Sequence, residues 1–260
     1  MKLSVIIPSY KDPYLQPTIH DLLCKSGLEE KMEIIVVLDG YWTQIVDDPR
    51  VKCVHLGRNR GMREAINAGV AVAKGEFIMR VDEHQIFGQG YDRILTETCK
   101  DDWIVTPKRF FLDVEKWEVM NLPPVEACKL VIKGGKFTGE NWESYSKEHE
   151  NEMIYETMAM QGSCWAMSRK WWDATVRELQ TEGYGQLIQD SHEMVFKTWK
   201  AGGKLMLNKN TWHAHKHRAF KRTHNNGTVE NPANCDEGYA YAIKVWGDYY
   251  EKEIRLLWQI

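Results

Sequence analysis

The sequence has no long hydrophobic run and almost no excess of charge. Its 260 residues include 34 lysines and arginines and 37 aspartates and glutamates, a formal net charge of −3. This near balance argues against a protein that coats nucleic acid through a generally basic surface, and it leaves room only for a local basic patch. No apolar stretch reaches the roughly 20 residues that cross a bilayer, and the apolar run at Leu3 begins too close to Met1 for a secretion signal. We therefore expect no membrane span and a cytoplasmic location.

Closely spaced cysteines are also absent. The six cysteines occur singly, without CxxC spacing, at Cys24, Cys53, Cys99, Cys128, Cys164 and Cys235. Disulfide frameworks and zinc sites usually show recognisable cysteine spacing. We therefore expect reduced thiols, most of them buried as small hydrophobic side chains.

Short apolar runs alternate with amphipathic segments through the first hundred residues. Strands are predicted at residues 3–8, 33–38, 51–56 and 77–81, and helices at residues 18–25, 61–73 and 91–99. Continuous apolar strands separated by helices are typical of a parallel sheet that is covered on both faces. We predict an α/β fold, a single Rossmann-like domain with a central, mostly parallel sheet flanked by helices and a C-terminal helical segment.

The second half of the chain is less regular. It predicts strands at residues 103–107, 162–167 and 205–207, and helices at residues 170–179, 190–200 and 236–257. Between residues 108 and 156 the periodicity is weak, and the role of this stretch stays open.

The most informative motif is Asp82-Glu83-His84, at the end of the apolar run Phe77–Val81. Ligands of open α/β sheets bind at the carboxyl ends of the strands. A carboxylate and an imidazole two residues apart can hold a divalent cation from one side and leave its other positions for a diphosphate. Mn²⁺ is the expected ion, with Mg²⁺ as the alternative. Glu83 points the other way in an extended chain, so we expect it to be structural.

A second motif, from Trp212 to Arg218, has histidines at alternating positions. In an extended segment His213, His215 and His217 all lie on one face. Arg218 has the planar fork that binds phosphate through two hydrogen bonds. The alternative interpretation is a solvated basic loop.

Taken together, these landmarks resemble the GT-A-fold glycosyltransferases of the broad family 2 lineage. The resemblance covers residues 3–98 and 160–218, and the segments that carry it are residues 4–10, 36–40, 59–61, 65–69, 75–78 with Asp82, 190–193 and 199–203. The last two segments are similar to the acidic helix of polypeptide N-acetylgalactosaminyltransferases. Those enzymes also have a DxH triplet, with a distal histidine and an arginine three residues beyond it.

The resemblance implies a role for each matching residue. Asp82, His84 and His215 are expected to hold the metal, with His213 as the alternative third ligand. The donor-binding residues implied are Pro8, Ser9 and Tyr10 around the nucleoside, Asp39 on the base, Arg63 on ribose or phosphate, Gly162 against the sugar, and Arg218 on the diphosphate. The competing interpretations are a turn-forming Asp39 and a solvated Arg63.

Asp190 and Glu193 lie three residues apart and therefore on one face of the predicted helix. In inverting members of the lineage an acid near this place deprotonates the acceptor hydroxyl. In the retaining relatives the acid positions sugar and acceptor instead. The sequence leaves both roles open, together with that of solvated helix carboxylates, although the DxH triplet with His215 favours retention.

The expected function is metal-dependent transfer of a hexose from a UDP-sugar to a hydroxyl of a glycan, a small molecule or a modified base. The chain divides into a nucleotide-sugar-binding half (1–98), an acceptor-binding half (99–224) with a lid (212–224), and a helical tail (225–260). No obligate protein partner is evident.

Two alternatives to this function stay open. The first is a DNA glycosyltransferase that acts on hydroxymethylpyrimidine bases of phage-type DNA, suggested by a basic cluster of Lys108, Arg109, Lys216, Arg218, Lys221 and Arg222. The second is a non-catalytic module that binds a nucleotide sugar or nucleic acid. A nucleotidyltransferase is disfavoured, because residues 9–12 do not form a glycine-rich loop.

Overall fold

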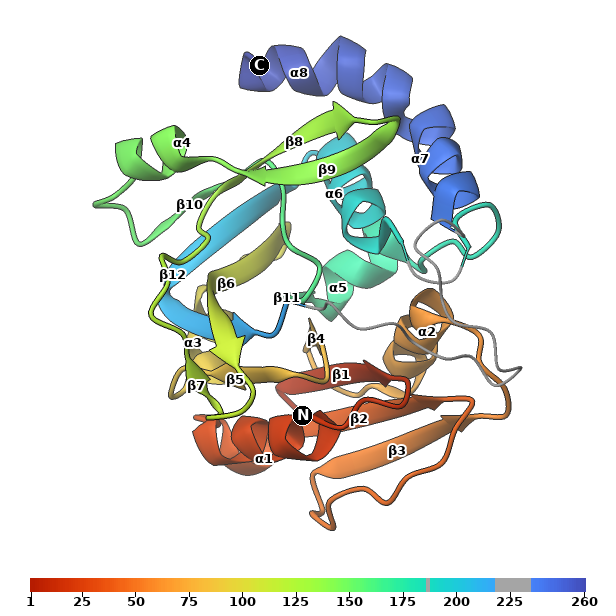
Figure 1. Cartoon of the computed structure of the whole chain (residues 1–260). Coiled ribbons are helices and arrows are strands. Elements are labelled where there is room, and N and C mark those ends of the chain that lie inside the picture. Colours follow the sequence, from red (N-terminus) through yellow and green to blue (C-terminus); the bar gives the residue numbers. More distant parts are fainter. Residues whose placement is uncertain (186–187, 218–234) are drawn as a thin grey trace.

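A ten-stranded mixed sheet forms the centre of the computed structural model, which describes residues 1–185, 188–217 and 235–260 (Figure 1). The strand order is β10-β12-β6-β11-β4-β1-β2-β3, with β5 paired to β12 and β7 paired to β6. The strands are β1 (Leu3–Ser9), β2 (Met32–Asp39), β3 (Val51–Leu56), β4 (Phe77–Val81), β5 (Gln85–Phe87), β6 (Trp103–Asp113), β7 (Glu118–Val119), β10 (Ile154–Glu156), β11 (Cys164–Ser168) and β12 (Lys204–His215). A separate hairpin consists of β8 (Cys128–Lys133) and β9 (Lys136–Asn141).

Helices lie on both faces of the sheet. They are α1 (Leu15–Lys25), α2 (Met62–Val72), α3 (Tyr91–Thr98), α4 (Glu143–Glu148), α5 (Arg169–Trp171), α6 (Asp190–Lys200), α7 (Asp236–Tyr249) and α8 (Arg255–Trp258). Shorter turns are the 3-10 helix η1 (Glu29–Lys31) and the π-helical segments η2 (Trp172–Val176) and η4 (Tyr250–Ile254). None of the helices among the described residues is long and apolar enough to span a membrane.

The parallel half of the sheet confirms the predicted α/β class. β1 pairs in parallel with β2 and β4, and β2 pairs in parallel with β3. Successive side chains of a strand point to opposite faces. Val5 therefore packs in the cluster that contains Ile19 of α1, whereas Ile6 packs in the cluster that contains Ile66 of α2. Burial on both faces explains why these strands are continuous apolar runs.

The remaining strands are joined to this half through β11, which is antiparallel to both β4 and β6. β12 pairs in parallel with β6 over residues 204–208 and 212–215 and is far longer than the predicted residues 205–207. The register shifts between Asn208 and Trp212, and a β-bulge of this kind breaks the apolar alternation from which a strand is recognised. Residues 212–215, expected to belong to a lid, are therefore part of the sheet.

The C-terminal helices pack against the β8–β9 hairpin and α6, at the end of the molecule opposite β3 (Figure 1). The hydroxyl of Tyr250 donates to the carbonyl of Leu130, 2.7 Å away. The rings of Trp246 and Phe196 stack with centroids 5.2 Å apart. The predicted helix at residues 236–257 is confirmed, whereas the one at 170–179 is replaced by the short α5 and the π-helical turn η2.

Candidate active site

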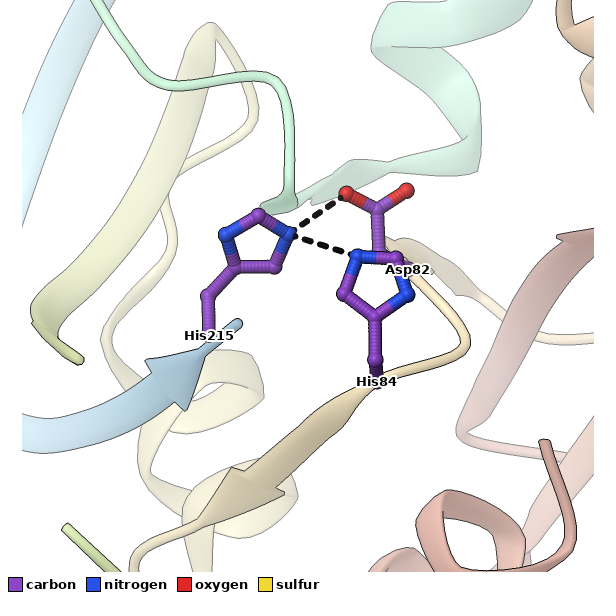
Figure 2. A group of neighbouring side chains, drawn as sticks. All are labelled: Asp82, His84 and His215. Carbon is purple, nitrogen blue, oxygen red and sulfur yellow. Dashed lines mark hydrogen bonds and ion pairs between the residues drawn. The ribbon is translucent and has the colours of Figure 1, made fainter. Parts of the chain in front are cut away.

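One carboxylate and two imidazoles meet at the carboxyl edge of the sheet (Figure 2). Asp82 directly follows β4, His84 directly precedes β5, and His215 is the last residue of β12. Nε2 of His215 lies 3.0 Å from Oδ2 of Asp82 and 3.0 Å from Nε2 of His84. The three possible ligand atoms all lie within 4.8 Å of one another. This donor set suits a divalent transition metal such as Mn²⁺ better than Ca²⁺, which prefers oxygen ligands alone.

The imidazole of His84 is oriented by a carboxylate behind it. Nδ1 of His84 lies 3.0 Å from Oδ2 of Asp12, and both side chains are almost fully buried. A proton on Nδ1 leaves the lone pair of Nε2 facing Asp82 and His215. Carboxylates hold metal-binding histidines in this way, because they fix both the tautomer and the ring plane. The pair therefore fits a metal ligand better than a packed core histidine.

The charge states of the group also favour metal binding. Although burial raises the pKa of Asp82, the Arg80 guanidinium, 2.7 Å from Oδ1, and the two histidines hold it well below its usual range. Burial lowers the pKa of His215 to about 4, despite the opposing effect of the Asp82 carboxylate. At neutral pH the site thus contains an ionised carboxylate and a neutral imidazole at these two positions, the forms that bind metals.

His213 lies outside this group. Its Nε2 is 3.3 Å from Oγ of Ser163, and its Nδ1 is buried without a hydrogen-bond partner among the described residues. The geometry therefore favours His215 over His213 as the third ligand.

A small pocket adjoins Asp82, between the ends of β1 and β2 and the start of α2. It is lined by Pro8, Ser9, Tyr10, Asp39, Met62, Ala65 and Asp82. Five of these residues were expected from the sequence to contact a nucleoside or the metal. Strands β1, β2 and β4 are parallel neighbours, so the residues at their carboxyl ends meet at one edge.

Asp39 also shapes the loop that follows β3. Its carboxylate accepts hydrogen bonds from the backbone amides of Arg60 and Gly61, at 2.6 Å and 2.7 Å, and from the Asn59 side chain at 2.8 Å. Gly40 has a φ of +75°, and a Cβ there would lie 2.0 Å from the Asn59 backbone nitrogen. Asp39 and Gly40 therefore fix the loop against the strand end, and the contact of Asp39 with the donor base stays a prediction.

Gly162 and Asp190 lie on the other side of Asp82. Arg80 connects the two sides, because it pairs with Asp82 and donates to the carbonyl of Gly162. A Cβ at Gly162 would come within 3.5 Å of Oδ2 of Asp190. That oxygen is buried and has no hydrogen-bond partner among the described residues. An unsatisfied buried carboxylate oxygen is costly, so Oδ2 of Asp190 is free to accept a hydrogen bond beside Gly162.

Residues 4–175 match the family model of glycosyl transferase family 2. The chain belongs to this family. The matched segment contains the whole parallel half of the sheet, Asp82, His84 and β11. No curated protein sequence matches the chain significantly.

Solved structures share the fold of this family 2 member. A structure of GalNAc-T7 with UDP, GalNAc and Mn2+ has a TM-score of 0.75 and 16% identity over 98% of this chain. S. aureus TarS 1-349 in complex with UDP-GlcNAc has a TM-score of 0.61 and 13% identity over 97% of it. Another S. aureus TarS structure has a TM-score of 0.55 and 14% identity over 83% of it. The chain spans 50%, 68% and 37% of those chains respectively, and identities this low show the GT-A fold alone.

Two expected site residues are structural in this family 2 member. Arg63 and Glu193 form an ion pair whose side chains are 0% and 1% exposed. Arg63 also donates to the carbonyls of Gln180 and Ile188, at 2.6 Å and 3.0 Å. The expectations that Arg63 reaches ribose or phosphate and that Glu193 acts on the acceptor are therefore corrected. Both residues sit on the core-facing side of their helices, where they tie α2 to α6.

Sequence reasoning missed Asp12 and Arg80. The signal for Arg80 was present, since a charged residue within a continuous apolar strand must be paired. For Asp12 no local pattern indicated the contact with His84, 72 residues away. Glu83 is structural as expected, because its buried carboxylate accepts from the Tyr10 amide at 3.1 Å.

The predicted basic cluster is only partly described. Arg218, Lys221 and Arg222 lie outside the described residues. Lys216 donates to the hydroxyl of Tyr14, 3.3 Å away, and Lys108 pairs with Glu126 at 2.7 Å.

Proposed function

We propose that this family 2 member is a metal-dependent hexosyltransferase that moves a sugar from a UDP-sugar to an acceptor hydroxyl. The observation that carries the proposal is the convergence of Asp82, His84 and His215 beside the pocket that contains Asp39. The structural neighbours support it, since GalNAc-T7 was solved with UDP and Mn2+, and TarS with UDP-GlcNAc.

Each part of the site has a separate task in this proposal. Asp82, His84 and His215 would hold the ion, which when bound neutralises the charge of the departing diphosphate. The pocket residues Pro8 to Tyr10 and Asp39 bind the nucleoside. Since binding and orientation supply much of the rate enhancement in such transfers, the rigidity of these strand ends matters as much as their chemistry.

Gly162 faces the donor sugar, and Asp190 lies beside it where the sugar meets the acceptor. Glycine at position 162 lets the donor sugar approach the backbone, because any side chain there would meet α6. The unpaired Oδ2 of Asp190 accepts a hydrogen bond from a hydroxyl of the sugar or the acceptor. We propose this positioning role, with retention of anomeric configuration, and a cytoplasmic setting, which the free thiols of Cys24, Cys53, Cys99, Cys128 and Cys164 support.

The test is UDP release from UDP-sugars in the presence of Mn²⁺ or EDTA. We expect release with Mn²⁺ and none with EDTA, and we expect His84→Ala to lose at least 10-fold of the rate because one metal ligand is gone. His20→Ala is the matched control, since His20 is an exposed histidine on α1. Equal rates for His84→Ala and wild type, or metal-independent release, would contradict the metal assignment.

A further inference from the structure

Three arginines are buried near the active site, and only two of them face a carboxylate. Arg63 pairs with Glu193, and Arg80 pairs with Asp82. Residue Arg109 is only 8% exposed. Its side chain forms no ion pair and donates no hydrogen bond within the described parts of the chain. Its Nε is fully enclosed. With Nε enclosed and no carboxylate beside it, the Arg109 guanidinium is incompletely stabilised by the described residues and is suited to take a counter-ion from a ligand.

Strand pairing places Arg109 on the same face of the sheet as the metal group. In the parallel register of β6 and β12, Arg109 is opposite His213 and Phe111 is opposite His215. Paired residues, and residues two apart on one strand, point to the same face.

The immediate surroundings of Arg109 do not supply the missing charge. Its guanidinium carbon lies 4.9 Å from the centre of the Phe111 ring, a cation–π contact that offsets only part of the desolvation. The nearby acid Glu126 is already paired with Lys108 at 2.7 Å and with Lys209 at 3.8 Å. Burial keeps the neighbouring Cys128 thiol neutral by raising its pKa.

Arg109 lies away from the nucleoside pocket. That pocket is at the ends of β1, β2 and β4, and β11 separates β4 from β6. Ser163 and His213 connect Asp82 to Arg109. The Asp82 amide donates to the Ser163 carbonyl, Oγ of Ser163 contacts Nε2 of His213, and His213 is the strand partner of Arg109. The backbone bridges Arg109–Val125 and Cys128–Ala159 link this part of β6 to the segment that leads into Gly162, which faces the donor sugar in the proposed function. Arg109 therefore lies beyond the donor sugar from the nucleoside pocket, on the side from which the acceptor approaches.

We propose that Arg109 binds a phosphate or carboxylate carried by the acceptor, so that this enzyme glycosylates an anionic acceptor. The inference rests on the proposed function, because it takes the metal group and its pocket as the donor site. A planar guanidinium is the side chain best suited to hold either oxyanion through two hydrogen bonds.

The test measures binding to the protein saturated with UDP and Mn²⁺, which fills the donor site. Glucose, glucose 6-phosphate, glucuronate and inorganic phosphate are titrated by calorimetry into wild type, Arg109→Gln, Arg109→Lys and Arg93→Gln. Arg93 is an exposed arginine on α3 and serves as the matched control. We expect at least one anionic probe to bind more tightly than glucose, and Arg109→Gln to weaken it by roughly 10- to 100-fold. Arg109→Lys should keep part of the effect, and Arg93→Gln should keep all of it.

The outcomes separate this inference from the proposed function. If UDP with Mn²⁺ does not bind to the wild type, the donor site itself is wrong. If UDP binds and no anionic probe exceeds glucose, only the inference is overturned. It is also overturned if Arg109→Gln weakens the binding of UDP as much as that of the anionic probe, since Arg109 would then bind the diphosphate of the donor. If circular dichroism shows that Arg109→Gln is unfolded, the decision rests on Arg109→Lys. This variant keeps the charge but lacks the planar fork, so it must weaken binding of the anionic probe without changing UDP affinity.

Discussion

The contact between Asp12 and His84 allows a sharp test of the metal site, through the substitution Asp12→Asn. Oδ2 of Asp12 accepts from Nδ1 of His84 at 3.0 Å, while Oδ1 accepts from the Tyr14 amide at 2.8 Å at the start of α1. Asparagine keeps one oxygen for the Tyr14 amide. Its NH2 group, however, takes the place of Oδ2 and donates a hydrogen bond, so Nδ1 of His84 must become the acceptor. The proton then moves to Nε2, the atom that faces Asp82 and His215.

The expected loss follows from this change of tautomer. Replacing the carboxylate partner of a metal-binding histidine typically costs 10- to 100-fold in metal affinity, or about 1.4 to 2.7 kcal/mol. The thermal midpoint of Asp12→Asn should fall less than that of Asp12→Ala, because Asp12→Ala also removes the acceptor for the Tyr14 amide, a lost hydrogen bond that costs about 1 kcal/mol. Mn²⁺ affinity measured by electron paramagnetic resonance, with His84→Ala as the lower limit, checks the prediction. Wild-type Mn²⁺ affinity in Asp12→Asn would refute the reasoning.

Three further predictions concern other parts of the molecule. Gly40→Ala should destabilise the fold by about 1–3 kcal/mol and weaken UDP binding, because the new Cβ would collide with the backbone of Asn59; unchanged denaturant midpoint and UDP affinity would contradict it. Glu193→Gln should cost about 3–5 kcal/mol in urea unfolding, since it leaves the buried Arg63 without its ion-pair partner. The control Glu64→Gln on α2 removes only a partly exposed ion pair with Arg60 and should cost under about 1 kcal/mol. Proton NMR of the first-formed product should show retained anomeric configuration, and an inverted anomer would instead assign Asp190 as a general base.

The parallel half of the fold and the position of Asp82 and His84 at the edge of the sheet were predictable because local and global signals agree there. β1, β2 and β4 are continuous apolar runs that end at polar loops, and the carboxyl ends of such strands form ligand sites. The positions of Asp82 and His84 follow directly from this geometry. The prediction that His215 joins them relied on the spacing in the family, since no local pattern links His215 to Asp82, which is 133 residues away in the sequence.

The errors have physical causes in particular residues. Arg63 and Glu193 were expected in the site because helix periodicity does not show which face a partner helix covers. The hairpin β8–β9 was overlooked although Gly134 and Gly135, both with positive φ, form the type of two-residue turn that joins hairpin strands. Only one face of that hairpin is buried, as Cys128 and Leu130 show, so its apolar pattern is weak.

The late position of β12 in the chain bears on how the molecule folds. β6 and β10 are both partners of β12, and neither pairs with the other. Until β12 inserts, the sheet has an open edge that can pair with another chain, and Asp82 and His84 lack their third neighbour. Contacts between such distant segments form slowly. An ion held by all three residues would favour the state with β12 inserted, so loss of the metal ligands would expose the molecule to aggregation as well as inactivity.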